Sequence, residues 1–124
     1  MALIMIADDD VALATLLKDF LQSRTHQVVV VNDGIAASIK AQEWRPQLIV
    51  MDIMMPGVYG TSAYKTLESA GVAKTTPFIF ITSVPLEKAR AIVPDTPRTR
   101  LLPKPIDFAK LEAAVDELLA PPAS

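Results

Sequence analysis

The chain has no cysteine, and none of its apolar runs is long enough to cross a bilayer. The lack of cysteine excludes a disulfide framework and any metal site built from thiolates. The N-terminus lacks the basic region, the long apolar stretch and the cleavage site of a signal peptide, so none is expected. We therefore expect a cytoplasmic protein without membrane insertion.

Clustered basic charge is also lacking. The 124 residues include 12 Lys or Arg and 14 Asp or Glu, which gives a net charge of −2 without a basic stripe. Nucleic acid is not expected as a direct partner, because binding to a phosphate backbone depends on clustered cations. Hydrophobic residues make up 51% of the chain, enough for the core of one domain. We expect that domain to span residues 1–120, followed by a flexible tail at 121–124.

Apolar segments of two kinds alternate along the chain. Short continuous runs are typical of buried strands, while apolar residues at helical spacing indicate amphipathic helices. The predicted strands are residues 3–7, 28–31, 48–51, 78–81 and a short one around 101–102, and the predicted helices are residues 11–23, 34–43, 62–70, 86–93 and 108–119. Five successive strand–helix units predict an α/β fold with a five-stranded parallel sheet, doubly wound, with helices on both faces.

Polar side chains follow four of the predicted strands at the point where each strand ends. Asp8 and Asp9 follow the first strand, Asp52 the third, Thr82 the fourth and Lys104 the fifth. In a parallel sheet the carboxyl ends of the strands share one edge, and ligands bind there. We therefore expect these side chains to form one site.

Three carboxylates at one edge repel one another and call for a cation. Two unit charges about 5 Å apart repel by roughly 3 kcal/mol at an effective dielectric constant of about 20. Asp8, Asp9 and Asp52 form the oxygen-rich set that suits Mg²⁺. Lys104, held between two prolines, is placed to contact an anion bound there. Asp10, by contrast, is predicted to cap the helix that follows it.

In this order and spacing the motifs resemble those of the response-regulator receiver domain of two-component signalling, over essentially the whole chain. The matching segments are Asp8-Asp9, Asp52 to Pro56 with Gly60, Thr82-Ser83 and Lys104-Pro105. The resemblance implies a flavodoxin-like strand order, 2-1-3-4-5. It also implies a protein-interaction switch controlled by phosphorylation, and not a turnover enzyme.

The resemblance further implies which residues do the chemistry. Asp52 is the phosphoacceptor, which takes a phosphoryl group from a phosphohistidine of a partner histidine kinase or phosphotransfer protein. Mg²⁺ is bound directly by Asp9, Asp52 and the backbone carbonyl of Met54, while Asp8 acts largely through water.

Two more residues link this chemistry to signalling. By the same resemblance, Thr82 and Lys104 take the remaining phosphoryl oxygens and couple phosphorylation to a surface formed by the fourth helix, the fifth strand and the fifth helix. The output protein that reads this surface is unknown, and the chain is expected to be a monomer or a weak dimer.

Three positions depart from the usual family pattern. Leu101 stands where family members usually carry a Tyr or Phe that swings inward on activation. The segment 93–100, with two prolines, replaces a frequent Gly-Ala-Asp element and predicts a short fourth helix. Tyr59 replaces a common Asp before Gly60, at a position outside the phosphorylation chemistry.

Other functions remain open at this point. The same fold could serve as a docking module that works without phosphorylation, although the complete set of site residues argues against it. An Mg²⁺-dependent phosphohydrolase with Asp52 as nucleophile is a third class, but such enzymes need a second Asp where this chain has Met54. A dinucleotide-binding domain is weaker still, because this chain has no Gly-rich turn after its first strand. His26, the only histidine, is expected at the surface.

Overall fold

The computed structural model describes residues 2–55 and 60–120. Strands and helices alternate as predicted, with one additional 3₁₀ turn before β4. The elements are β1 (Leu3–Ala7), α1 (Val11–Ser23), β2 (Gln27–Val31), α2 (Gly34–Trp44), β3 (Leu48–Asp52), α3 (Gly60–Ser69), η1 (Val72–Lys74), β4 (Phe78–Thr82), α4 (Leu86–Ile92), β5 (Thr99–Pro103) and α5 (Phe108–Leu119). The five strands form one parallel sheet in the order β2-β1-β3-β4-β5, which confirms the predicted flavodoxin-like topology.

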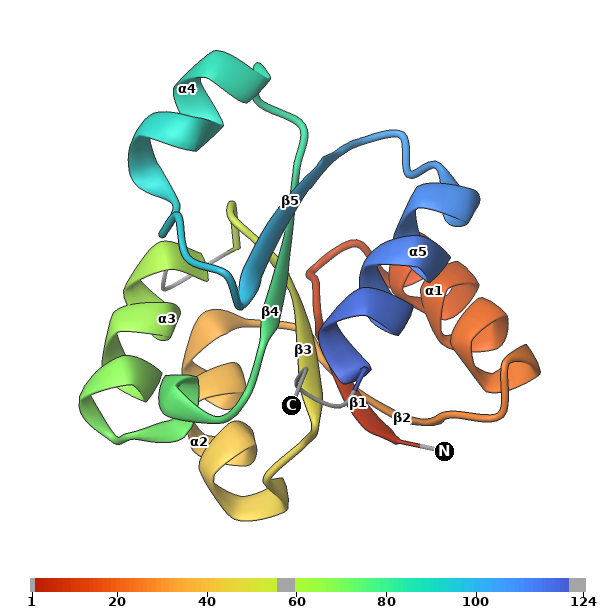
Figure 1. The fold of residues 1–124 in the computed structure, drawn as a ribbon, viewed down its shortest axis with the longest axis horizontal. Coiled ribbons are helices and arrows are strands. Elements are labelled where there is room, and N and C mark those ends of the chain that lie inside the picture. Colours follow the sequence, from red (N-terminus) through yellow and green to blue (C-terminus); the bar gives the residue numbers. More distant parts are fainter. Residues whose placement is uncertain (1, 56–59, 121–124) are drawn as a thin grey trace.

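Helices cover the sheet on both sides, so that the molecule has three layers (Figure 1). Helices α1 and α5 pack on one face, where Leu17, Leu21 and Leu111 are buried against the sheet. Helices α2, α3 and α4 pack on the other face, around Phe78 and Phe80. The central strands β3 and β4 are buried at every residue, which explains why their sequences are continuously apolar and do not alternate.

The pairing of the strands brings their carboxyl ends to one edge. Asp52, the last residue of β3, pairs with Ile81, next to the end of β4. Thr82, the last residue of β4, pairs with Pro103, which directly precedes Lys104. Residues that lie far apart in the sequence therefore come together at the predicted edge.

Side-chain caps fix where the helices start. The Asp10 carboxylate accepts a hydrogen bond from the Leu13 amide at 3.1 Å, which confirms the predicted cap of α1. Asp33 and Asp107 cap α2 and α5 in the same way. Beyond the end of α3, Gly71 has a φ of +85°, a left-handed conformation that glycine adopts without steric cost.

Some predicted boundaries were wrong. Strand β5 is longer than the predicted pair at 101–102, because pairing with β4 extends it to include Thr99 and Arg100. The 3₁₀ turn η1 was not predicted. Among the described residues, no helix is both long and apolar enough to cross a membrane. Pro56, Tyr59 and the tail at 121–124 lie outside the described residues.

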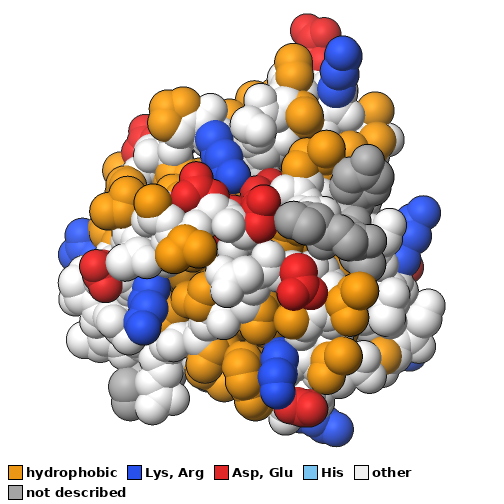
Figure 2. Space-filling view, turned by 180° about the vertical axis from the view of Figure 1, so that it is seen from behind, with side chains coloured by type: hydrophobic (Ala, Val, Ile, Leu, Met, Phe, Trp, Pro, Cys, Tyr) orange, Lys and Arg blue, Asp and Glu red, His pale blue; other side chains and the backbone are white. Residues whose placement is uncertain are grey.

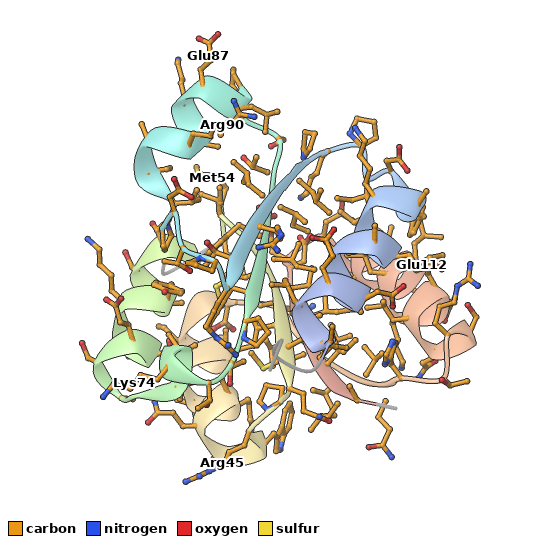
Figure 3. All side chains as sticks on the ribbon, in the orientation of Figure 1. Arg45, Met54, Lys74, Glu87, Arg90 and Glu112 are labelled. Atoms are coloured by element: carbon orange, nitrogen blue, oxygen red, sulfur yellow. The ribbon has the colours of Figure 1, made fainter. Side chains whose placement is uncertain are left out.

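Charged side chains are spread over the surface. On the face shown in Figure 2, Lys and Arg side chains are separated from one another by acidic, apolar and neutral groups. Arg45 directly after α2, Lys74 in η1 and Glu87 in α4 point away from the body of the protein (Figure 3).

Candidate functional site

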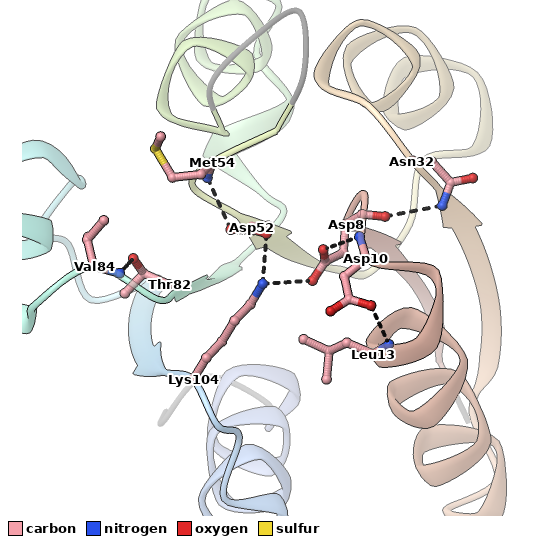
Figure 4. Close-up of polar contacts among 9 residues, drawn as sticks. All are labelled: Asp8, Asp10, Leu13, Asn32, Asp52, Met54, Thr82, Val84 and Lys104. Atoms are coloured by element: carbon pink, nitrogen blue, oxygen red, sulfur yellow. Dashed lines mark hydrogen bonds and ion pairs between the residues drawn. The ribbon is translucent and has the colours of Figure 1, made fainter.

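The end of β1 places Asp8 inside the protein. Its amide donates to the Val31 carbonyl of β2 at 3.1 Å, and its own carbonyl accepts from the Asn32 side-chain amide at 3.1 Å. Its carboxylate Oδ1 accepts from the Asp10 amide at 2.9 Å (Figure 4). With none of its surface exposed, Asp8 is a carboxylate that folding has removed from water.

Asp52 occupies the equivalent place at the end of β3. The amide that follows it, that of Ile53, donates to the Ile81 carbonyl of β4 at 3.0 Å and continues the sheet. The Asp52 carboxylate Oδ1 accepts from the Met54 amide at 3.1 Å, while the Met54 thioether points away from the carboxylates (Figure 4). Backbone bonds therefore orient the carboxylate, and the sulfur takes no part.

Lys104 extends from the end of β5 into this acidic group. Its amide donates to the Thr82 carbonyl at 2.7 Å, which holds the loop between the two prolines against β4. Its ammonium Nζ donates to Asp52 Oδ2 at 2.9 Å and lies 3.5 Å from Asp8 Oδ2 (Figure 4). One cation thus bridges the carboxylates at the ends of two different strands.

Burial and charge shift the ionisation of these groups. Burial raises the pKa of Asp8 to about 6; the Asp10 hydrogen bond and the Lys104 charge oppose the rise, and the Asp52 charge adds to it. Burial disfavours the charged form of Lys104, but the hydrogen bond to Asp52 and the two carboxylate charges outweigh it and raise its pKa. The three carboxylates of the site therefore carry more negative charge than the Lys104 ammonium balances.

The carboxylates are arranged as a cation site. Asp8, Asp9 and Asp52 each offer an oxygen, and these oxygens lie within 4.8 Å of one another. Asp8 Oδ2 is buried and accepts no hydrogen bond from the described residues. Asp9 is exposed and leaves the site open to solvent. An all-oxygen set with one side open to water fits Mg²⁺, which retains several waters when bound to proteins.

Thr82 ends β4 on the other side of Lys104. Its side chain is fully buried, and its hydroxyl accepts from the Val84 amide at 3.0 Å. Val84 leads into α4, so the hydroxyl is connected to the start of that helix. Asp8, Asp52 and Thr82 share one local arrangement, in which a side-chain oxygen at a strand end accepts from the amide two residues later.

The model of the response regulator receiver domain family matches residues 4–116. The chain belongs to this family. Receiver domains act in two-component signalling, generally without enzymatic turnover, and bind Mg²⁺ at their acidic site. The predicted resemblance to this family is therefore confirmed.

Related proteins include single domains and longer chains. PilH of Pseudomonas aeruginosa is 28% identical, with 97% of this chain and 99% of PilH covered. Probable transcriptional regulator ycf29 of Pyropia yezoensis is 28% identical over 94% of this chain, which spans only 53% of that relative. The match to the response regulator MtrA of mycobacteria, 33% identical over 53% of this chain, covers 29% of MtrA.

Solved receiver domains have the same fold. The receiver domain of the sensor histidine kinase PA1611 from P. aeruginosa is 25% identical, with a TM-score of 0.86 and 95% and 97% of the two chains covered. That structure holds a magnesium ion in its active-site cleft. The chemotaxis response regulator CheY4 of Vibrio cholerae is 27% identical, with a TM-score of 0.82 and coverages of 96% and 99%.

One contact of the site, made by Asn32, was not predicted from the sequence. Asn32, which bonds the Asp8 carbonyl, directly follows β2 at the same edge of the sheet. A polar residue at the end of a predicted strand was the feature that could have identified it.

The structure also shows how deeply His26 and Leu101 are buried. His26 was expected at the surface but is half-buried, and its Nδ1 is enclosed without a hydrogen-bond partner among the described residues. The cause is a turn that folds the chain back between α1 and β2, where the His26 amide donates to the Leu21 carbonyl. Leu101 is half-buried against the core on the side of α4.

Proposed function

We propose that this receiver domain accepts a phosphoryl group on Asp52 from a phosphohistidine of a histidine kinase or phosphotransfer protein, and that phosphorylation changes its protein interactions. One observation carries the proposal: the Lys104 ammonium lies 2.9 Å from Asp52 within a group of three carboxylates. A purely structural ion pair needs one carboxylate, whereas this group holds more negative charge than its lysine can balance.

The transfer requires an oxygen nucleophile and stabilisation of the phosphoryl charge. A carboxylate oxygen of Asp52 forms a bond to phosphorus as the phosphorus–nitrogen bond of phosphohistidine breaks, and the bonding electrons return to the imidazole, which takes up a proton. Lys104, already next to Asp52, moves with little displacement to a phosphoryl oxygen. Mg²⁺, when bound, supplies positive charge that offsets the developing charge on the phosphoryl oxygens.

Membership of the receiver family assigns the metal ligands, and exposure and position support the assignment. Asp9, Asp52 and the Met54 carbonyl would hold the ion directly; Asp9 is exposed, and Met54 directly adjoins the Asp52 turn. Asp8 contributes mainly through water, as its Oδ1 is held by the Asp10 amide. Its Oδ2, which lies 3.5 Å from the Lys104 ammonium and accepts no hydrogen bond from the described residues, is the oxygen that a metal-bound water would contact.

Thr82 provides the route from phosphate to the surface. A hydroxyl donates one hydrogen bond and accepts two, so Thr82 can donate to a phosphoryl oxygen while it accepts from Val84. A change in that contact acts on the loop that leads into α4, as a population shift between nearby states. Leu101 has no ring or hydroxyl, so this route works without an aromatic switch.

The test is the intact mass of the protein after exposure to a small phosphodonor, with and without Mg²⁺. We expect one added phosphoryl group that requires Mg²⁺ and is absent in Asp52→Asn. Asp10→Asn is the matched control, because its side chain still caps α1 and takes no part in the chemistry.

The alternatives give different results. Phosphate that persists in Asp52→Asn contradicts the assignment of the acceptor. An unmodified protein under all conditions favours the docking module, and sustained hydrolysis of many donor molecules per protein, with no trapped phosphoprotein, favours the phosphohydrolase.

A further inference from the structure

A cavity lies at the edge of the sheet opposite to Asp52. Gln47, Pro77 and Arg98 line it, and each directly precedes a strand, namely β3, β4 and β5. The five residues of β3, at about 3.3 Å each, separate Gln47 from Asp52 by about 17 Å. The volume of the cavity, about 570 Å³, lies within the range of about 300–1,000 Å³ that is typical of small-molecule sites.

The charged groups of this cavity have one sign. Among the described residues, its lining includes Arg45 and Arg98 and no Asp or Glu. Neither arginine forms an ion pair with a described residue. Two other cavities at the surface differ, because arginine lines them together with Asp95 in one and with Glu112 in the other. The positive charge of the first cavity is therefore uncompensated, which favours an anion.

Arg98 is held in place while most of its donors remain available. Its Nη2 donates to the Thr75 carbonyl at 2.5 Å, which ties the guanidinium to the loop before β4. A guanidinium has five N–H groups, and the others make no hydrogen bond with the described residues. Such a planar fork binds a carboxylate or a phosphate through two parallel hydrogen bonds. Arg45 is exposed and points outward (Figure 3), so its side chain has room to turn toward the same anion.

The helix ends near this cavity do not cancel the charge of the arginines. A helix carries a partial negative charge of about half a unit at its carboxyl end. The carbonyls at two of these ends are already used: that of Ala41 in α2 accepts from the Arg45 amide at 3.1 Å, and that of Glu68 in α3 accepts from the Gly71 amide at 3.0 Å. Two full positive charges with unused N–H groups therefore still favour an anion.

Part of the lining is apolar. Val72, Leu118 and Leu119 line the cavity and are half-buried. Contact with an apolar group would remove their remaining surface from water, which is favourable. A molecule that joins an anionic group to an apolar body therefore fits this lining better than a bare inorganic ion does.

We infer that this cavity binds a small organic anion, whose carboxylate or phosphate group contacts Arg98 and Arg45 and whose apolar body lies against Leu118 and Leu119. The cavity is at the opposite edge of the sheet from Asp52. The inference therefore goes beyond the proposed function and does not depend on it.

The test is a titration of the whole chain, without metal, followed by the NMR shifts of its backbone amides. The probes are benzoate, phenyl phosphate, neutral benzamide and inorganic phosphate. We expect saturable shifts at Gln47, Val72 and Thr76 with at least one organic anion, and binding at least about tenfold weaker with benzamide and with inorganic phosphate. Tighter binding of benzoate or of phenyl phosphate identifies the anionic group.

Three variants assign the contacts. Arg98→Gln should weaken binding by about tenfold or more, because it removes the fork. Arg45→Gln should weaken it by about threefold, and it leaves the Thr75 contact of Arg98 intact. Arg90→Gln is the matched control and should bind like the unaltered chain, because Arg90 lines a different cavity, beside Asp95.

Several results would overturn the inference. One is the lack of saturable shifts with both organic anions up to about 10 mM. Another is benzamide or inorganic phosphate binding as tightly as the organic anions. Affinities in Arg98→Gln or Arg45→Gln equal to that of Arg90→Gln, or shifts confined to the edge that carries Asp52, would have the same meaning.

Discussion

At the carboxyl edge of the sheet, the ends of β1, β3 and β4 differ from the end of β5. At the first three, Asp8, Asp52 and Thr82 are held by the amide two residues later, within their own turns. At the fourth, Lys104 makes its side-chain contacts with residues from two other strands. The comparison separates two tasks: local turns orient the oxygen atoms, and one long-range cation balances their charge.

A change at Asp8 that keeps the local turn but removes the charge is expected to have the largest effect on stability. Asp8→Asn retains an acceptor for the Asp10 amide. Because the folded pKa of about 6 lies above the unfolded value of 3.8, the unfolded state ionises first as pH rises, and the wild type loses stability between about pH 4 and pH 6. The variant should avoid this loss, up to about 3 kcal/mol, at pH 7 and above.

Urea unfolding of both proteins in metal-free buffer across this pH range measures the difference. The two curves should converge near pH 4, diverge between pH 4 and pH 6, and stay apart by a constant amount above pH 6. A constant difference at all pH values would show that the raised pKa of Asp8 is not its source.

Removal of the long-range cation should act in the opposite direction. Lys104→Ala removes the hydrogen bond from the partly exposed lysine to Asp52, leaves Asp52 and Asp8 facing each other without compensation, and is expected to lower the free energy of unfolding by about 2 kcal/mol without metal. Mg²⁺ should recover part of the loss, since it supplies the missing positive charge. Lys110→Ala, an exposed lysine on α5, is the control and should change little. Equal stability of the two variants would mean that Lys104 does not balance the carboxylates.

The smallest expected effect concerns the exposed member of the cluster. Mg²⁺ at about ten times its Kd should stabilise the wild type by about 1.4 kcal/mol and raise the melting temperature by about 4 °C. Asp9→Asn should reduce this response, because Asp9 is the open carboxylate of the site. Thermal unfolding with and without the metal decides the point, with Asp10→Asn as the neighbouring control. If Asp9→Asn responds like the wild type, Asp9 does not bind the metal directly.

Much of the site could be predicted from the sequence because its residues lie at the ends of strands. An apolar run that ends in Asp8 or Asp52 is visible in the sequence itself. Parallel pairing then brings the carboxyl ends of these strands to one edge of the sheet. The cap at Asp10 depends on only a few neighbouring residues, and it was predicted correctly. The length of β5 was not, since its residues become strand only through pairing with β4.

The sequence by itself determined the alternation of elements, the parallel sheet and the polar residues at the strand ends, because these depend on local periodicity and on the rules of parallel crossover. The order of the strands was predicted from the resemblance to the receiver family. Only the tertiary structure decided that Asp8 is fully buried while its neighbour Asp9 is exposed, and that Lys104 reaches Asp52 from 52 positions further along the chain. The partial burial of His26, with its Nδ1 enclosed, also appeared only in the folded structure. Exposure and charge pairing depend on which surfaces meet in three dimensions, and one-dimensional periodicity does not contain that information.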